Sequence, residues 1–208
     1  MRMRTKKNLI PRLERVSHLI CEKPKEMKGK WASGRQLHLE IGCGKGDFIL
    51  ELAERNPDIQ YVALEVVKEA AVMALEKVDE KKLANVIFIL EDAKNISEYF
   101  DKGEVDRIYL NFSDPWPKKK KAKRRLTHPD FLKIYKEILN EEGEIHQKTD
   151  NVDFFEFSLE SYKEMGFALY ETTYDLHSTD FSDNIMTEYE KRFVAEGKPI
   201  CRVVAKLK

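Results

Sequence analysis

The sequence has no net charge, few cysteines and no long apolar stretch, and each of these deficits excludes a class of protein. Three cysteines are an odd number without metal-ligand spacing, so we expect reduced thiols in a cytoplasmic protein rather than a disulfide framework. The longest apolar run, residues 70–75, is far too short to span a bilayer. Because no apolar segment follows the basic N-terminal residues, no secretory signal is predicted. The histidines are scattered without ligand spacing, so we expect no metal site.

The length of 208 residues indicates one domain, or one domain with an arm. An apolar fraction of 42% is ordinary for a globular protein, whereas 36% charged residues is high. The sequence contains no internal repeat. We therefore expect a single core with a strongly charged surface.

The zero net charge hides two basic blocks. Residues 1–30 contain ten Lys or Arg and three Asp or Glu, and residues 118–125 contain seven Lys or Arg and no acid. Because the whole chain is neutral, the remainder is acidic. Such segregation indicates that a defined face binds an anionic macromolecule, although a disordered arm or a solvated loop would also account for it. We predict a basic N-terminal arm of residues 1–35 and a domain of residues 36–208.

After residue 35, short apolar runs alternate with stretches of helical periodicity. The expected strands cover residues 36–44, 60–66, 86–92, 106–114 and 143–150. The expected helices cover residues 47–56, 68–83, 127–139 and 151–166. Two late strands, 167–176 and 199–207, are expected to pair as an antiparallel hairpin with no helix between them. This order predicts an α/β fold whose mostly parallel sheet is covered by helices on both faces.

The stretch EIGCGKG ends the first expected strand and opens a helix, with glycines at positions 42, 44 and 46. Glycines allow a sharp turn and a close approach of the backbone to a ligand. Glu65 ends the second expected strand, where a carboxylate can accept both ribose hydroxyls of an adenosine. The loop therefore predicts a nucleotide-containing ligand, either a dinucleotide or S-adenosylmethionine.

Acidic residues around this loop favour S-adenosylmethionine. A dinucleotide brings a pyrophosphate, which binds best at a helix N-terminus with cationic help. Here the surroundings are instead Glu40, Asp47, Glu65 and Asp92. These carboxylates suit a ligand that has no phosphate and carries a sulfonium charge, although Glu40 and Asp92 could also be simple strand-end caps.

The stretch NFSDPWPKKKKAKRRL, residues 111–126, places an acid, a proline and a tryptophan directly before seven cations. Pro115 fixes its own φ, and Trp116 offers a flat face on which a base could stack. Trp116 could equally be a packing anchor. If the fourth strand ends here, Asp114 lies on the same sheet edge as the glycine loop.

These motifs together resemble the bacterial tRNA (guanine-N7-)-methyltransferases. The matching segments are GCGKG, EV at 65, DA at 92, FSDPWPKKKKAKRR, KTD at 148 and TEYEKRF at 187. The resemblance covers residue 36 to the end, and its most specific part is the DPWPK run with the cations after it. The chain has Pro117 where many relatives have His and Cys43 where many have Phe.

The resemblance implies a Rossmann-like class I methyltransferase fold with a seven-stranded sheet. It also implies transfer of a methyl group from S-adenosylmethionine to guanine N7 in the tRNA variable loop (position 46 by tRNA convention). The implied cofactor site is Glu40, Gly42, Gly44, Glu65, Asp92 and Asp114, of which Asp114 is also the catalytic position. The implied substrate contacts are Lys118, Asp150, Thr187, Glu188, Tyr189 and Glu190. The implied RNA contacts are Lys120, Lys121, Ala122, Lys123, Arg124 and Arg125.

Two alternatives remain open from the residues alone. One is an S-adenosylmethionine enzyme that methylates an exocyclic amine of a nucleic acid, which commonly has Asn/Asp-Pro-Pro with an aromatic residue after the fourth strand. The other is a non-catalytic RNA-binding module on the same fold. A membrane-surface role is disfavoured because neither basic block forms an amphipathic helix with a large apolar face. The partner is expected to be tRNA, and the sequence leaves monomer and homodimer undecided.

Overall fold

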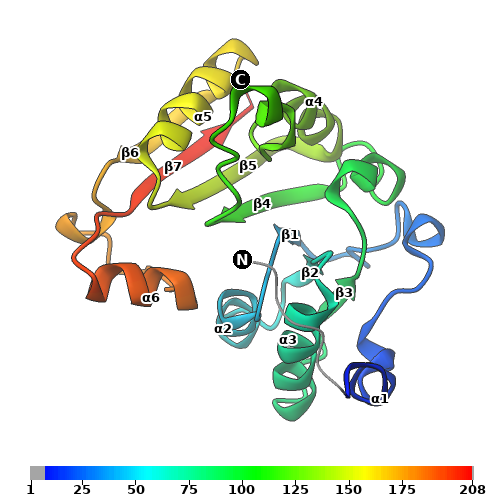
Figure 1. Cartoon of the computed structure of the whole chain (residues 1–208). Helices are drawn as coiled ribbons and strands as arrows, with labels where there is room; N and C mark the ends of the chain where they lie inside the picture. The colour runs from blue at the N-terminus through cyan, green and yellow to red at the C-terminus, as the bar shows by residue number, and fades with distance from the viewer. Residues whose placement is uncertain (1–7, 208) are drawn as a thin grey trace.

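The computed structural model describes residues 8–207, and seven strands form one sheet in the order β3-β2-β1-β4-β5-β7-β6 (Figure 1). The strands are β1 (Leu37–Ile41), β2 (Gln60–Leu64), β3 (Val86–Ile89), β4 (Val105–Asn111), β5 (Leu139–Thr149), β6 (Ala168–Thr173) and β7 (Cys201–Lys206). Strands β1 to β5 are parallel, whereas β7 lies antiparallel between β5 and β6. The predicted mostly parallel sheet with an antiparallel C-terminal pair is confirmed.

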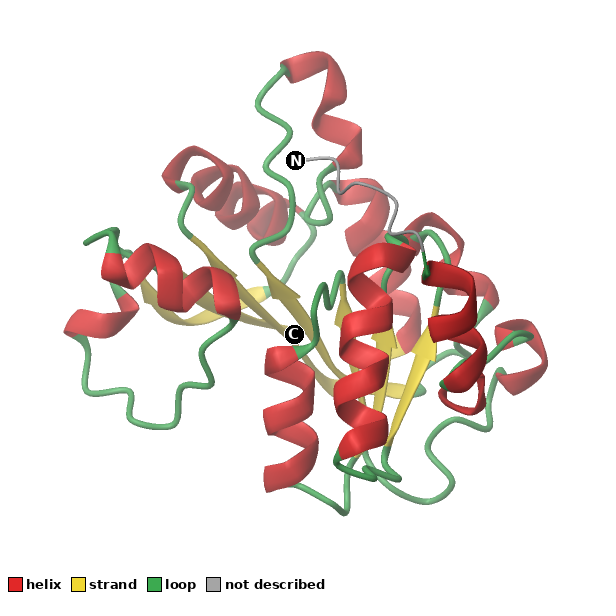
Figure 2. Ribbon diagram, turned by 60° about the horizontal axis from the view of Figure 1, so that its bottom comes forward, coloured by secondary structure: helices red, strands yellow, loops and turns green. Residues whose placement is uncertain are grey.

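Helices cover both faces of the sheet (Figure 2). The α-helices of the described residues are α1 (Leu9–Arg15), α2 (Asp47–Arg55), α3 (Lys68–Glu80), α4 (Pro129–Ile138), α5 (Val152–Glu164) and α6 (Glu188–Ala195). On one face, α2 and α3 pack over β2 and β3 through residues such as Leu75 and Phe88. On the other, α4 and α5 pack over the central strands through residues such as Leu132 and Phe155. Each face therefore has its own apolar core, as expected for an α/β sheet.

The described part of the N-terminal segment packs closely against the rest of the domain. In α1, Arg12 Nε donates to Glu76 Oε1 of α3 at 2.7 Å. Downstream, the Cys21 N–H donates to the Phe88 carbonyl at the β3 edge of the sheet. Trp31 is 4% exposed and joins the core under α4 and α5. The division at residue 35 stays a prediction, residues 1–7 lie outside the described part, and residues 8–35 contribute core contacts.

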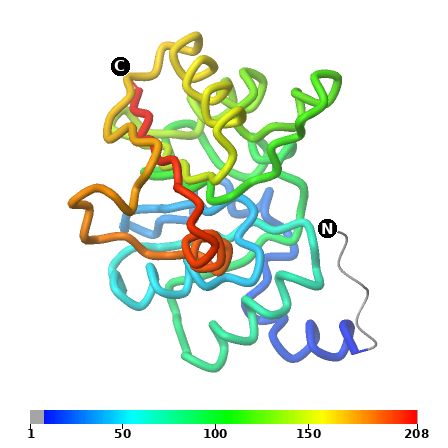
Figure 3. Tube along the Cα trace, turned by 60° about the vertical axis from the view of Figure 1, so that its left-hand side comes forward, coloured from blue at the N-terminus to red at the C-terminus, as the bar shows by residue number. Residues whose placement is uncertain are grey.

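The expectation that no helix separates the last two strands is wrong. The chain forms a 3₁₀ turn, Leu176–Ser178, and then α6 before it returns as β7 (Figure 3, orange to red). Thr187 caps α6, because its Oγ1 accepts the N–H of Glu190 at 3.0 Å. Phe193 anchors the helix against Ile200. Its first residues, 187–189, form one wall of a cavity at the carboxyl ends of the strands.

Candidate active site

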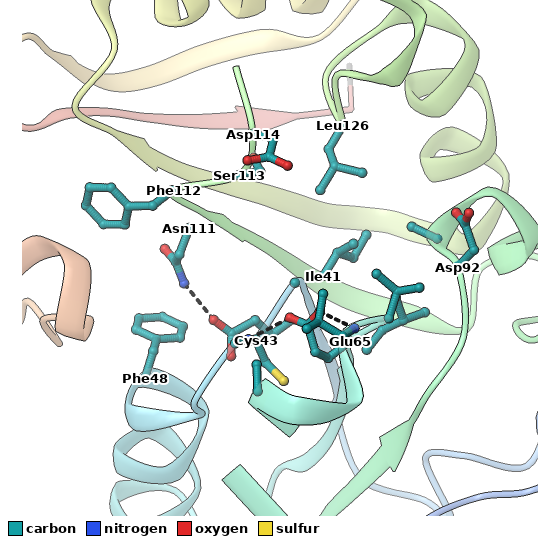
Figure 4. Close-up of a pocket in the computed structure, with 18 of the residues that line it drawn as sticks. Ile41, Cys43, Phe48, Glu65, Asp92, Asn111, Phe112, Ser113, Asp114 and Leu126 are labelled. Carbon is teal, nitrogen blue, oxygen red and sulfur yellow. Dashed lines mark hydrogen bonds between the residues drawn. The ribbon is translucent and has the colours of Figure 1, made fainter. Parts of the chain in front are cut away.

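The carboxyl ends of β1 and β4 lie side by side, although these strands are not consecutive in the chain. Ligands in open parallel sheets bind at such a switch point. A cavity of about 790 Å³ opens there, lined by the loops after β1, β2, β3 and β4 and by residues 187–189. Figure 4 shows Glu65, Asp92 and Asp114 around it, each from a different strand end.

The loop after β1 brings backbone to the cavity. Gly42, Gly44 and Gly46 have φ values of +82°, +56° and +80°. A Cβ at Gly46 would lie 2.4 Å from the Cβ of Ala74, so the packing of this loop on α3 requires glycine. At Gly42 and Gly44 a Cβ would meet nothing within 4 Å. The loop therefore leaves open space beside its backbone, into which a ligand can approach closely.

Glu65 is held rigidly at the end of β2 by backbone donors. Its Oε2 accepts the N–H of Gly44 at 2.9 Å and its Oε1 accepts the N–H of Val67 at 2.8 Å. The residue is 7% exposed. A carboxylate has about four acceptor positions, so each oxygen retains one for a ligand hydroxyl.

Glu40 is a buried carboxyl group with an unused acceptor. Its Oε1 accepts Asn111 Nδ2 at 3.0 Å, linking β1 to β4, while the buried Oε2 has no hydrogen-bond partner among the described residues. Burial raises the pKa of Glu40 to about 7, against the opposing effects of the Asn111 hydrogen bond and the positive charge of Lys148. A buried acceptor beside a cavity fits a ligand that supplies an N–H donor or a positive charge.

Asp92 and Asp114 complete the acidic rim. Asp92 follows β3 and caps the 3₁₀ helix Ala93–Glu98, with its Oδ1 accepting the Lys94 N–H at 3.0 Å. Asp114 is exposed in the turn after β4 and borders the cavity (Figure 4). Together with Glu40 and Glu65, these residues place four carboxyl groups around one cavity, which suits a cationic ligand better than a pyrophosphate.

The basic run folds back onto the turn that carries Asp114. Lys119–Arg124 form a 3₁₀ helix. Arg125 Nε donates to the Pro115 carbonyl at 2.9 Å and Nη2 to the Trp116 carbonyl at 3.2 Å. The Arg124 guanidinium lies 3.8 Å from the centroid of the Trp116 ring. Arg125 is thus engaged within the protein, and its hydrogen bonds fix the turn beside the cavity.

A buried polar network supports the wall formed by residues 187–189. Lys148 Nζ on β5 donates to Glu190 Oε2 at 2.5 Å and to the Ile185 carbonyl at 2.7 Å. Glu190 Oε1 in turn accepts Asn184 Nδ2 at 2.6 Å and is 3.0 Å from His177 Nε2. The side chain of Glu190 is 0% exposed and that of Lys148 is 7% exposed. The network ties the segment before α6 to the central sheet.

A second contact joins this wall to the glycine loop. Lys45 Nζ donates to Glu188 Oε1 at 2.6 Å, and both residues line the cavity. The neighbouring Tyr189 is 55% exposed. The loop after β1 and the start of α6 therefore close one side of the cavity together.

Comparison with known proteins places this chain in a family. The family model described as "Putative methyltransferase" matches residues 34–203. A tRNA (guanine-N(7)-)-methyltransferase of Streptococcus agalactiae is 47% identical over 210 residues, which are 99% of this chain and 100% of the relative. One of Bacillus licheniformis is 47% identical over 209 residues, covering 99% and 98%. The chain belongs to the tRNA (guanine-N(7)-)-methyltransferase family.

Solved structures support the fold expected of this methyltransferase family. A structure described as an antibiotic-related methyltransferase has a TM-score of 0.63 at 19% identity, over 87% of this chain and 92% of the other. TrmN from Thermus thermophilus has a TM-score of 0.58 at 22% identity, over 85% and 46%. These likenesses concern the fold alone and confirm the predicted Rossmann-like class I methyltransferase architecture.

The residues predicted for the methyltransferase site divide into two groups. Those that line the cavity are Glu40, Gly42, Gly44, Glu65, Asp92, Asp114, Lys123, Arg124, Thr187, Glu188 and Tyr189. The others lie outside the described lining and are Lys118, Lys120, Lys121, Ala122, Arg125, Asp150 and Glu190. Asp150 does not cap α5, because the side chain of Asn151 accepts the Phe154 N–H at 2.8 Å.

Sequence reasoning missed three polar residues that hold the walls of the cavity together, namely Lys45, Asn111 and Lys148. Asn111 precedes the DPW turn and Lys148 opens the KTD stretch, so both lay within motifs already noted. Among residues 8–207, no group of His, Cys, Asp or Glu is arranged to hold a metal ion. No helix in that range is long and apolar enough to cross a membrane.

Proposed function

We propose that this enzyme transfers the methyl group of S-adenosylmethionine to N7 of the variable-loop guanine of tRNA, position 46 by tRNA convention. One observation carries the proposal: a single cavity joins four strand-end carboxyl groups to the Asp-Pro-Trp turn and the basic helix after it. The name of the relatives gives tRNA as the substrate and guanine N7 as the methylated atom. An enzyme that modifies tRNA in a bacterial cell would act in the cytoplasm.

The cavity has the groups that S-adenosylmethionine requires. Bound there, the cofactor would supply a methyl group activated by a positively charged sulfur. Glu65 would accept ribose hydroxyls with the lone pairs that Gly44 and Val67 leave free. Glu40 Oε2 would accept an N–H of the ligand and so gain the partner that it lacks among the described residues. The open backbone at Gly42 would allow close approach.

Asp114 is proposed as the catalytic carboxylate. Guanine N7 has an in-plane lone pair and no proton, so no general base has to remove a proton before attack. Methylation at N7 leaves the purine ring positively charged. A fixed carboxylate beside the ring stabilises that developing charge, and the remaining catalysis is positioning.

The basic helix is proposed to hold tRNA phosphates. Lys118, Lys120 and Lys123 are exposed beside the turn that carries Asp114. Phosphate contacts set the register of an RNA without reading its sequence. Asp150 and the cavity wall at residues 187–189 are proposed to surround the target nucleotide.

A methylation assay with defined RNA tests the proposal. We expect an unmodified tRNA transcript, incubated with the protein and methyl-labelled S-adenosylmethionine, to yield 7-methylguanosine by nucleoside mass spectrometry. A matched transcript with adenine in place of the variable-loop guanine should yield none. Label in a guanine amino group would support the exocyclic-amine alternative, and S-adenosylmethionine binding without any transfer would contradict the proposal.

A further inference from the structure

Trp116 lines the cavity and has an unusual backbone conformation. Its φ is +41°, in the left-handed region that bulky residues rarely occupy. Arg125 stabilises this turn by donating to the carbonyls of Pro115 and Trp116. The side chain of Arg125 is itself seated over the Phe157 ring, 4.3 Å from the centroid. The orientation of Trp116 is therefore specified by its neighbours rather than left to the loop.

Two cations of the chain's own basic run lie over the Trp116 ring. The Arg124 guanidinium is 3.8 Å from the ring centroid, and Lys121 Nζ is 5.4 Å from it. Trp116 and Arg124 both line the cavity, so this pair borders the space that a substrate base would occupy. A guanidinium is flat and stacks on aromatic rings much as a nucleobase does.

We propose that Trp116 is the stacking platform for the target purine and that Arg124 covers it until RNA binds. On RNA binding, the base takes the ring face, and Arg124 moves to a phosphate of the same RNA. The inference rests on the proposed function, because it takes the target to be a purine in RNA.

The energetics favour this exchange only when RNA is present. Base stacking on an aromatic side chain is stronger than a solvent-exposed cation–π contact. The displaced Arg124 also gains a charge-assisted, bidentate contact with phosphate that a free nucleoside cannot provide. A free nucleoside must therefore break the contact between Arg124 and Trp116 with no new contact for Arg124, whereas RNA provides a phosphate for Arg124 to bind. Arg124 thereby favours a base attached to RNA over a free one.

The reaction changes the affinity of the base for this platform. A purine methylated at N7 is a cation, and a cation is attracted more strongly to the indole face than a neutral ring. The Trp116 ring is therefore expected to bind 7-methylguanosine more tightly than guanosine. Arg124 competes for the same ring, so its return promotes release of the methylated base.

Tryptophan fluorescence offers a direct test, because the chain has two tryptophans and the other, Trp31, is 4% exposed in the core. We expect 7-methylguanosine to quench the emission of the full-length protein, and a Trp116→Leu variant to show only the unquenched Trp31 background. Equilibrium dialysis should show that Trp116→Leu weakens nucleoside binding by at least about fivefold, with Trp116→Phe restoring part of it. Circular dichroism and S-adenosylmethionine binding check that each variant is folded.

Replacing Arg124 distinguishes the proposed movement of this residue from Trp116 to a phosphate from a purely structural role. Arg124→Ala should tighten binding of free 7-methylguanosine by about two- to fivefold, the size of one exposed cation–π contact, and should weaken tRNA binding. Lys119→Ala removes the same charge from an exposed position of the same helix and should leave nucleoside binding unchanged.

Three results would overturn the inference. They are unchanged nucleoside affinity in Arg124→Ala, a parallel loss of nucleoside and tRNA affinity in that variant, and unchanged nucleoside affinity in Trp116→Leu. The proposed function fails separately, through the nucleoside analysis of methylated tRNA. Quenching at Trp116 in a protein that forms no 7-methylguanosine would support the platform and reject the proposed reaction.

Discussion

The substitution Glu190→Gln tests what the buried network beside the cavity does. The family resemblance assigns Glu190 to the substrate, whereas its carboxylate is 0% exposed and 2.5 Å from Lys148 Nζ. Glutamine keeps the shape of the side chain but removes the charge. The Lys148 ammonium then remains buried without its partner, and burial already lowers the pKa of Lys148. We therefore expect the main effect to be on stability.

The magnitude follows from the burial of both groups. Removing one partner of a buried ion pair typically costs about 3–5 kcal/mol, because the other charge is left uncompensated. With a urea m-value of about 2 kcal/mol/M, a loss of about 3 kcal/mol lowers the unfolding midpoint by about 1.5 M. The double variant Lys148→Met/Glu190→Gln removes both charges and should recover part of the loss, with a coupling energy of about 2 kcal/mol.

Urea unfolding of the four proteins in this cycle measures both quantities, and the KM for tRNA of the folded variants measures the substrate effect. The account predicts a lower midpoint for Glu190→Gln and partial recovery in the double variant. An unchanged midpoint combined with a raised KM would refute it and identify Glu190 as a direct substrate contact.

Because burial raises the pKa of Glu40 from 4.5 to about 7, its contribution to stability is complete below pH 4.5 and is lost as the pH rises through 7, by about 3 kcal/mol in all. Glu40→Gln should remove that decline in the free energy of unfolding, measured with urea from pH 5 to 8.5. If the free energies of the variant and the wild type changed with pH in parallel, Glu40 would not be the group responsible. Asp114→Asn should lower kcat by about 10²–10³-fold and change S-adenosylmethionine affinity much less, as measured by turnover and calorimetry. Replacing Lys120 and Lys123 with Ala should flatten the log–log salt dependence of tRNA binding by about 0.7–0.9 per lost phosphate contact, and an unchanged slope would leave these lysines as solvated surface.

The fold was predictable because most of its elements have strong local signals. The helix Pro129–Ile138 has its proline in the first turn, and His128 caps it by accepting the Asp130 N–H at 3.2 Å. Helix α6 was missed because it has eight residues and buries few apolar side chains. The sequence does contain its capping pattern, a threonine at 187 followed three residues later by Glu190.

The rim of the site was predictable for a different reason. Glu65, Asp92 and Asp114 each follow a strand, and the carboxyl ends of parallel strands meet at one edge of a sheet. The network around Lys148 was not predictable, because its ion pair joins residues 42 positions apart. The contact between Arg124 and the Trp116 ring was not predictable either, since it depends on the 3₁₀ helix Lys119–Arg124, which brings the basic run back to the turn.

Methyl transfer to guanine N7 can be tested by changing that one atom of the substrate. A tRNA with 7-deazaguanosine at the target position has a C–H where the attacking nitrogen should be, while its shape, its phosphates and its exocyclic amine are retained. We expect this tRNA to compete with the unmodified tRNA for binding and to accept no labelled methyl group. Methylation of that nucleoside at the normal rate would contradict the claim and assign the reaction to the exocyclic amine.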